Sequence, residues 1–322
     1  MALISDRAIV LRRLDYSETS QILALFTREH GQVRVIAKGI KRSTRLRFAV
    51  GIDLLELGHV VWSARVDRPQ NLAILTEWKQ VDAFVGLRER LERLYAAQYA
   101  AEITAELTTD QDPHATLFDH LQLFLEKLSI VSCQSPVVSR QSSAEPRACP
   151  GLNSRKASAP QHSELSAQHS VLSPESSVLS PQSSVLNPQS FRTLADLCEF
   201  QRSLLIEIGL MPQGEHCVGC RSAITSDGAE GVYFTSHEGG LLCRDCEASY
   251  VEKRRVSPDV IRVLSGGPVD QHSALSTQSS VLSPRSSVLD SLAGEAFALL
   301  NYHISHLMHK APRLAKFVLP AI

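Results

Sequence analysis

Four cysteines carry the strongest chemical signal in the sequence. Cys217 and Cys220 form one C-x2-C pair, and Cys243 and Cys246 form a second pair that follows after 22 residues. A C-x2-C pair folds into a tight knuckle that aims two thiolates at one point. Two such knuckles supply four sulfur ligands in a tetrahedron, which is the arrangement of a closed structural zinc site. The spacing therefore predicts a structural zinc ion in a zinc ribbon.

Other metal chemistry uses similar ligands and has to be weighed beside zinc. Four thiolates can also hold an iron–sulfur cluster, so the identity of the metal stays open. A catalytic zinc is disfavoured because four thiolates leave no position for water. The zinc deaminase signature needs H-x-E and P-C-x-x-C, whereas His237 and Glu238 are adjacent here and Leu242 precedes Cys243. These features predict a binding protein and not an enzyme.

A second candidate site is a short basic segment near the N-terminus. Five of the ten residues 38–47 are cationic and none is acidic. Cations that follow phosphates, together with an aromatic such as Phe48 that stacks on bases, are typical of single-stranded nucleic-acid binding. A solvated surface loop is the alternative. The candidate DNA-binding residues are Lys38, Lys41, Arg42, Arg45 and Arg47.

Charge is distributed unevenly along the chain. The net charge is −1, but residues 1–81 carry 13 Lys/Arg against 8 Asp/Glu, and residues 82–130 carry 4 against 9. A positive N-terminal region indicates an anionic partner. The three aromatics Tyr16, Trp62 and Trp78 are expected in the core of this region and not on a stacking surface.

The basic segment lies among short runs rich in Val, Ile and Leu, which predict strands. Five short strands in about 80 residues fit a small closed barrel, because closure removes exposed sheet edges. An oligonucleotide-binding (OB-fold) barrel is the main candidate and an SH3-like barrel is the alternative. The predicted strands are Ala8–Leu14, Gln21–Thr27, Gln32–Lys38, Asp53–Trp62 and Leu72–Trp78.

After the strands, apolar residues recur with the period of an amphipathic helix. One helix is predicted from Asp82 onward, and others at Ala115–Leu128, Leu194–Ile208 and Leu292–Met308. The fold class is therefore α+β, with several domains. We expect a barrel in residues 1–80, a zinc finger in residues 213–250, and one helical domain in residues 81–130, 191–212, 251–265 and 292–322.

Two stretches repeat a seven-residue unit that contains Ser, Pro and a Val-Leu pair. The repeat fills residues 163–190 and returns at residues 273–291. A coiled coil is excluded because the apolar residues are adjacent and a proline would interrupt the helix in most units. Residues 131–190 and 266–291 are therefore predicted to be disordered insertions.

The location expected for the chain is the cytoplasm. Asp6 and Arg7 interrupt the apolar N-terminal run before it reaches the length of a signal peptide. No segment approaches the roughly 20 apolar residues of a membrane span. Seven cysteines, four of them in metal-type pairs, indicate a reducing compartment and not a disulfide framework.

With these motifs in view, the chain resembles the bacterial RecO recombination mediators. The order of barrel, helices, four-cysteine finger and last helix also matches that family. The resemblance covers most of the chain except residues 131–190 and about 266–290. The segments that carry it at the N-terminus are Ala8–Arg12, Asp15–Ser20, Leu25–Gly31, Ala37–Arg42 and Leu72–Glu77.

The resemblance implies a DNA repair protein that catalyses no reaction. RecO proteins bind single- and double-stranded DNA, anneal complementary strands, and engage the C-terminal tail of single-strand-binding protein. With RecR as partner they help to load the recombinase onto coated DNA, which implies a nucleoid-associated protein. The family's basic barrel loop falls on Lys38, Lys41 and Arg42, and Arg45 and Arg47 continue it. Its zinc ligands fall on Cys217, Cys220, Cys243 and Cys246.

Two other classes combine a barrel with a zinc ribbon. A DNA ligase would need a nucleotidyl-lysine motif of the K-x-D-G type, and the sequence contains no such tetrapeptide. A zinc-ribbon RNA-binding protein or transcription or translation accessory factor remains the alternative. A strand-annealing assay with DNA and RNA side by side separates that class from a recombination mediator.

Overall fold

The fold is taken from a computed structural model of the 322-residue chain. It describes residues 2–40, 51–64, 72–130, 188–224, 232–257, 260–261 and 284–318. All of these belong to one compact unit formed by Met1–Val131 and Leu186–Ile322. No helix among the described residues is both long and apolar enough to cross a membrane.

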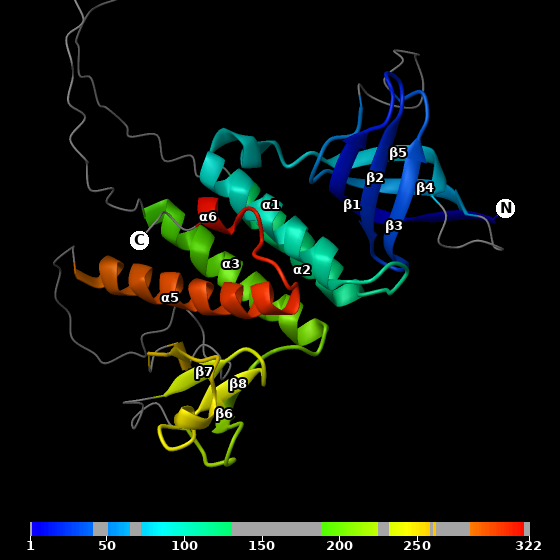
Figure 1. Cartoon of the computed structure of the whole chain (residues 1–322). Helices are drawn as coiled ribbons and strands as arrows, with labels where there is room; N and C mark the ends of the chain where they lie inside the picture. Colours follow the sequence, from blue (N-terminus) through cyan, green and yellow to red (C-terminus); the bar gives the residue numbers. More distant parts are fainter. Residues whose placement is uncertain are drawn as a thin grey trace, which may run out of the picture. The chain divides into compact units, whose positions relative to one another are not determined.

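The N-terminal part is a closed barrel of five strands (Figure 1). Around the barrel the order is β1, β2, β3, β5, β4, and all neighbours are antiparallel except β3 and β5. Inward positions such as Leu23, Leu25 and Val35 are fully buried. The strands are β1 (Ala2–Asp15), β2 (Gln21–Thr27), β3 (Gly31–Ala37), β4 (Leu57–Ala64) and β5 (Ala73–Asp82).

All five predicted strands are present, with shifted ends. The first is longer than predicted because β1 pairs with β4 over its first half and with β2 over its second. Trp62 and Trp78 are buried in the barrel, as expected. Tyr16 is not: its exposed fraction is 65%, because it lies beyond the end of β1, in the turn to β2. The expectation that Tyr16 is a core residue was wrong.

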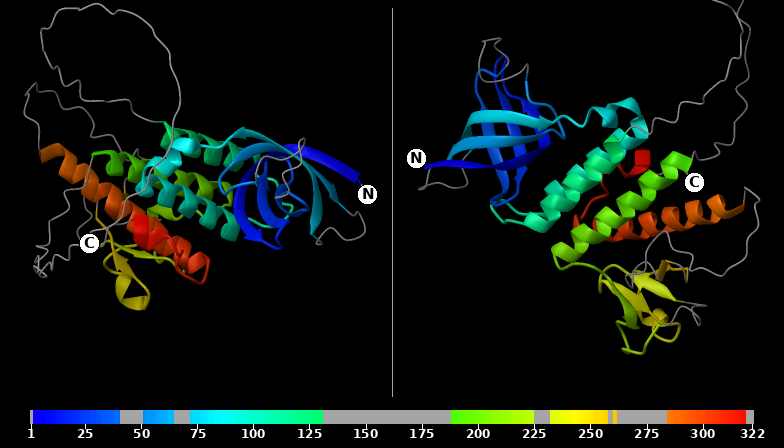
Figure 2. Two further views of the ribbon diagram at one scale, coloured as in Figure 1. Left: turned by 90° about the horizontal axis from the view of Figure 1, so that it is seen from above. Right: turned by 180° about the vertical axis from the view of Figure 1, so that it is seen from behind.

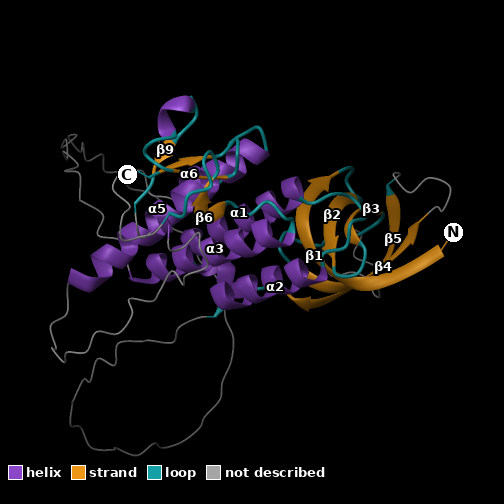
Figure 3. Ribbon diagram, turned by 90° about the horizontal axis from the view of Figure 1, so that it is seen from below, coloured by secondary structure: helices purple, strands orange, loops and turns teal. Residues whose placement is uncertain are grey.

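The helices pack side by side next to the barrel (Figure 2), and the strands gather in the barrel and in the finger (Figure 3). The helix that was predicted from Asp82 begins only at Leu91. β5 continues to Asp82, and Phe84 has a φ of +44°, a left-handed conformation that a right-handed helix does not contain. The helical elements are η1 (Val85–Glu89), α1 (Leu91–Leu107), α2 (Ala115–Ser129), α3 (Pro188–Glu207), α5 (Pro284–Leu307) and α6 (Ala315–Val318).

Two helices begin inside the ranges that the sequence assigned to disordered insertions. α3 begins at Pro188 and α5 at Pro284, and both prolines belong to the repeated unit. A proline interrupts a helix in its interior but fits its first turn, where the missing N–H has no partner to lose. The prediction was therefore wrong for residues 188–190 and 284–291. The other residues of the two insertions lie outside the described residues.

Opposite charges fasten the barrel to the helices. Arg28, after β2, donates to both carboxylate oxygens of Asp119 on α2, at 3.0 and 2.8 Å. Glu106 on α1 pairs with Arg12 of β1 and, at 2.6 Å, with Lys310. These cations hold the pKa of Asp119 and of Glu106 below their usual values. The charge asymmetry of the sequence is thus partly balanced inside the molecule, and it is a weaker sign of an anionic partner than it first appeared.

Uncharged contacts complete the attachment at the start of β3. Gln32 donates from Nε2 to the carbonyl oxygens of Thr108 at 2.8 Å and of Ala105 at 3.1 Å, at the end of α1. Gly31 has a φ of +67° and lies directly against the α1–α2 loop. A methyl group added there would come within 2.2 Å of the carbonyl oxygen of Asp112. Only glycine therefore fits between the barrel and this loop.

The substitution Gly31→Ala should destabilise the protein by about 3 kcal/mol, from left-handed backbone strain of about 1–2 kcal/mol and crowding of about 1–3 kcal/mol. Gly209→Ala is the matched control, because Gly209 has a φ of +72° but nothing within 4 Å of the added methyl. The control should be destabilised only by the backbone strain of about 1–2 kcal/mol. Urea unfolding of both variants measures the difference, and equal losses would contradict the close contact.

Candidate metal centre and nucleic-acid surface

A small four-stranded sheet, which follows α3 and precedes α5 in the sequence, carries the cysteines (Figure 1). The order of strands is β6, β8, β7, β9, and a short 3-10 turn follows the second cysteine pair. In the first knuckle the backbone reverses at Arg221, whose φ is +62°, and the N–H of Arg221 donates to the carbonyl of Cys217 at 2.8 Å. The elements are β6 (Gln213–Cys217), β7 (Tyr233–Thr235), β8 (Gly240–Leu242), η3 (Glu247–Ser249) and β9 (Arg254–Arg255).

The four predicted ligands are brought together. The Sγ atoms of Cys217, Cys220, Cys243 and Cys246 all lie within 4.8 Å of one another, and those of Cys220 and Cys243 are 3.7 Å apart. In a tetrahedron with zinc–sulfur bonds of about 2.3 Å, the sulfur atoms are about 3.8 Å apart. The donor set and its spacing therefore fit a zinc ion bound by four thiolates.

Local hydrogen bonds favour thiolates in the first knuckle. The Ser222 hydroxyl, 2.9 Å from the Sγ of Cys220, is the main cause that lowers the pKa of Cys220 to about 6. Burial raises the pKa of Cys217, but backbone N–H groups, led by that of Cys243 at 3.3 Å, outweigh it and the pKa lies below its ordinary value. The bond to Cys243 is the main cause that raises the pKa of Cys246 to about 12. A metal at the centre displaces such protons, because only thiolates bind it.

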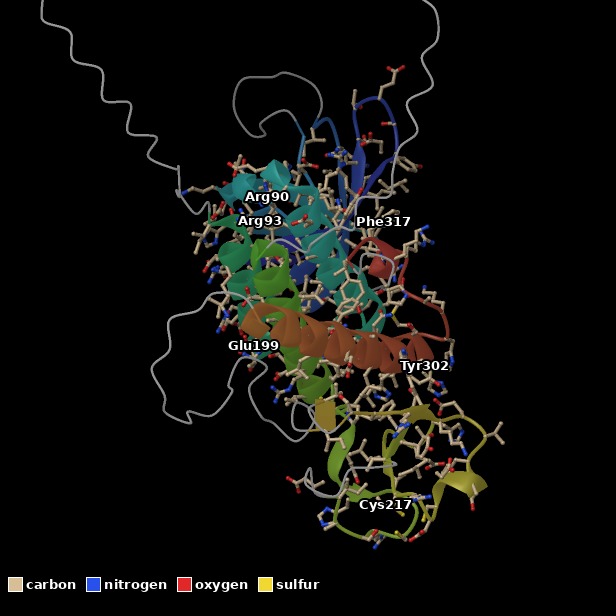
Figure 4. The ribbon with its side chains drawn as sticks, turned by 90° about the vertical axis from the view of Figure 1, so that its left-hand side faces the viewer. Arg90, Arg93, Glu199, Cys217, Tyr302 and Phe317 are labelled. Carbon is tan, nitrogen blue, oxygen red and sulfur yellow. The ribbon has the colours of Figure 1, made fainter. Side chains whose placement is uncertain are left out.

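The finger is fastened to α5 through Glu252. This carboxylate accepts hydrogen bonds from the Thr235 hydroxyl at 2.8 Å, from the backbone N–H groups of Ser236 and His237, and from the hydroxyl of Tyr302 on α5. Figure 4 shows Tyr302 on α5 beside the finger that carries Cys217. Burial raises the pKa of Glu252, but these hydrogen bonds outweigh it, so the pKa lies below its ordinary value.

The histidines of α5 have different roles. In the sequence, His303, His306 and His309 recur every third residue, and this spacing predicts a solvated or DNA-facing edge of the helix. His303, however, is only 3% exposed. Its Nδ1 lies 2.8 Å from the Ser236 hydroxyl and its Nε2 lies 3.1 Å from the carbonyl oxygen of Leu210, so it joins the finger to α5. Among the described residues, the four cysteines are the only cluster with metal-binding geometry. Spacing of three residues alone could not show which histidine faces the finger.

Of the predicted DNA-binding residues, Lys38 is described. It is exposed, follows the end of β3 directly, and makes no ion pair within the described part of the chain. Lys41, Arg42, Arg45 and Arg47 lie outside the described residues. By contrast, Arg34, within β3, pairs with Asp110 at 3.0 Å.

The fold is a closed barrel joined to helices that carry a finger whose four cysteines could hold a metal ion. Two family models match it: "Recombination protein O N terminal" over residues 1–84 and "Recombination protein O C terminal" over residues 88–139. The chain belongs to the RecO family. The recognition made from the N-terminal motifs and the finger is confirmed.

Curated relatives carry the name "DNA repair protein RecO". The chain is 42% identical to that of Rhodopirellula baltica over 113 residues, which are 35% of this chain and 40% of the relative. It is 28% identical to that of Anaeromyxobacter sp. (strain Fw109-5) over 238 residues, 74% of this chain and 68% of the relative. It is 27% identical to that of Anaeromyxobacter dehalogenans (strain 2CP-1) over 245 residues, which are 75% of this chain and 71% of the relative. The match to the first relative thus spans less than half of that protein.

Freshly purified protein should contain one zinc ion per chain, and Cys243→Ser should lose it. Metal binding contributes about 10–16 kcal/mol in isolated zinc fingers, so the finger of this variant should unfold locally. Cys198→Ser is the control, since Cys198 is buried in the helical core away from the finger. Elemental analysis with limited proteolysis tests this prediction. Iron in place of zinc, or no metal in the wild type, would contradict it.

Replacing Glu252 should loosen the finger without removing the metal. Glu252→Ala leaves two backbone N–H groups and two hydroxyls without their acceptor, which should cost roughly 2–4 kcal/mol in urea unfolding at neutral pH. Since the folded-state pKa of Glu252 is lowered, its contribution is complete near neutral pH and is lost as the pH falls through that lowered pKa. The difference between wild type and variant should therefore shrink in acid.

The control for Glu252 is Glu238→Ala, which removes an exposed carboxylate from the same finger. This change should alter stability by no more than about 0.5 kcal/mol. Zinc content should match the wild type in both variants. If Glu252→Ala were as stable as the control, Glu252 would not be the attachment point.

Proposed function

We propose that the protein acts in recombinational DNA repair without catalysing a reaction. It binds single- and double-stranded DNA, anneals complementary strands, and mediates loading of the recombinase onto DNA coated with single-strand-binding protein. Membership of the RecO family supports this proposal. Its partners are RecR and the C-terminal tail of single-strand-binding protein, and it works in the cytoplasm at the nucleoid.

The barrel is proposed to be an OB fold that carries the DNA contact. A closed five-stranded barrel in the order β1-β2-β3-β5-β4 supports this assignment. The observation that carries the proposal is how the barrel arginines differ from Lys38. Arg12, Arg28 and Arg34 are paired with carboxylates of α1, α2 and the loop between them, whereas Lys38 is exposed and has no ion pair in the described part of the chain.

Binding by this surface is electrostatic. Each cation that meets a phosphate releases a condensed counterion, so affinity falls with salt and depends little on sequence. Two complementary strands that are both neutralised by protein repel each other less, which favours annealing without any bond-making chemistry. The zinc ion supplies no chemistry to this step: its proposed role is to hold the finger, with the exposed Arg254 and Arg255, in one shape.

If Lys38, Lys41, Arg42, Arg45 and Arg47 all neutralise phosphates, the salt slope for single strands should be about −3.5, at ~0.7 per contact. Affinity should then fall roughly a hundredfold between about 50 and 200 mM salt. Replacing Lys41 and Arg42 with Ala should flatten the slope by about 1.4 for every sequence, and Lys38→Ala by about 0.7.

Salt titrations of the wild type and the variants on mixed-sequence strands make this comparison. Arg34→Ala is the matched control, because Arg34 is a barrel cation already paired with Asp110. It should leave the slope nearly unchanged. Parallel lines for wild type and Lys41/Arg42 variant would place the DNA contact elsewhere, first at Lys253, Arg254 and Arg255. Faster annealing of RNA than of DNA strands would favour an RNA-binding accessory factor.

A further inference from the structure

An apolar row crosses the outer face of the barrel near the β1–β2 turn. Leu14 pairs with Ile22, Ile22 with Ile36, and Ile36 with Ile74. Residues that pair directly across a sheet place their side chains on the same face. Leu14 is 62% exposed and Ile74 is 40% exposed, while Ile22 and Ile36 between them are half-buried. Four neighbouring strands thus present aliphatic side chains outward in one line.

Tyr16 extends this face beyond the end of β1. Its N–H donates to the carbonyl oxygen of Ser20 at 3.0 Å, which continues the β1–β2 ladder by one pair. Because side chains alternate along a strand, Tyr16 lies on the side of Leu14 and opposite to Asp15. No described residue forms a ring contact with Tyr16, so the ring is free to stack.

Lys38 stands at the same end of the sheet. Asp15 pairs with Gln21 and Gln21 with Ala37, which directly precedes Lys38. Two strand spacings of about 4.8 Å therefore separate the backbones at Tyr16 and Lys38 by about 10 Å. Three stacked nucleotides at about 3.4 Å each span this distance.

Among the described residues, Asp15 and Glu18 are the carboxylates nearest to Tyr16 in the sequence. Asp15 accepts a hydrogen bond from Nε2 of Gln21 at 3.2 Å. Glu18 is exposed in the turn, as Asp15 is at the end of β1, and both carboxylates repel a phosphate that approaches the turn.

We propose that Tyr16 is a base-stacking residue, and that a single strand crosses the outer barrel face from Tyr16 to Lys38. The proposal rests on the DNA-binding function above. An aromatic ring beside a cation is the combination that holds single strands, with the ring on a base and the cation on a phosphate. The aliphatic row beside Tyr16 offers further apolar contact to bases and sugars.

Stacking on Tyr16 also distinguishes single strands from duplex. In a duplex each base is already stacked between its neighbours and has no free face for the ring. When two complementary strands pair, their bases leave Tyr16, and the duplex keeps only the phosphate contacts. The ring therefore favours the substrate of annealing over its product, which helps the protein to release the duplex.

The test compares the full-length wild type and variants on three probes of equal length: a mixed-sequence single strand, an abasic single strand, and a duplex. Tyr16→Ala should bind the mixed-sequence strand about tenfold more weakly, the effect of losing about 1.4 kcal/mol of base stacking. Abasic and duplex binding should not change. Tyr16→Phe, which keeps the ring, should bind as the wild type does, and Tyr16→Leu should lose as much as Tyr16→Ala.

Glu18→Gln is the control, because it changes charge in the same turn without touching the ring. It should alter affinity for the single strand, the abasic strand and the duplex alike.

A loss of affinity for Tyr16→Ala that is equal on all three probes, or no loss at all, overturns the stacking role of Tyr16. Salt-dependent binding that still needs Lys38 would then leave the proposed function standing. Tyr16→Leu binding like the wild type also overturns it, and points to the apolar row as a protein contact. A wild type that binds none of the probes refutes both proposals.

Discussion

Charge pairing between barrel and helices is the constraint on which the arrangement of the molecule depends. Arginines of the barrel meet carboxylates of α1, α2 and their loop, with Arg28 and Asp119 joined by two hydrogen bonds. Gly31 lies directly against the same loop, so the contact at this end of the barrel is close. β2 spans seven residues, about 20 Å, from this end to the turn that holds Tyr16. The attachment therefore leaves the opposite end, with Tyr16 and Lys38, free for a ligand.

The finger depends on two interactions of different chemistry. The four cysteines converge from its two knuckles, whereas Glu252 and His303 define where the finger lies on α5. Apolar residues of the finger, including Phe234 and Leu241, belong to the same core as the helices. The four-cysteine cluster is thus part of the folded body.

Much of this arrangement could be predicted from sequence, for identifiable reasons. Strands such as β2 follow from alternation, and the cysteine cluster follows from spacing, because both are local signals. The prolines 188 and 284 were interpreted as helix breakers, although at a first turn they begin helices. Tyr16 and His303 were assigned to the wrong environments, because exposure depends on which strand end or helix face meets a neighbour. That information is not local in sequence.

The same distinction explains why charge counting alone misplaces a nucleic-acid surface. A segment rich in arginine looks like a phosphate-binding site until its partners are known, and most of the described barrel arginines have carboxylate partners within the chain. A cation that is paired with a carboxylate must break that ion pair before it binds a phosphate, and the free energy lost reduces the binding free energy that is gained. Only an unpaired cation contributes fully to DNA binding. Lys38, exposed and without an ion pair in the described part of the chain, meets this condition, and Arg34 within β3 does not. The useful quantity is therefore the charge left after internal pairing, and Lys38 supplies such a charge at the end of the barrel away from the helices.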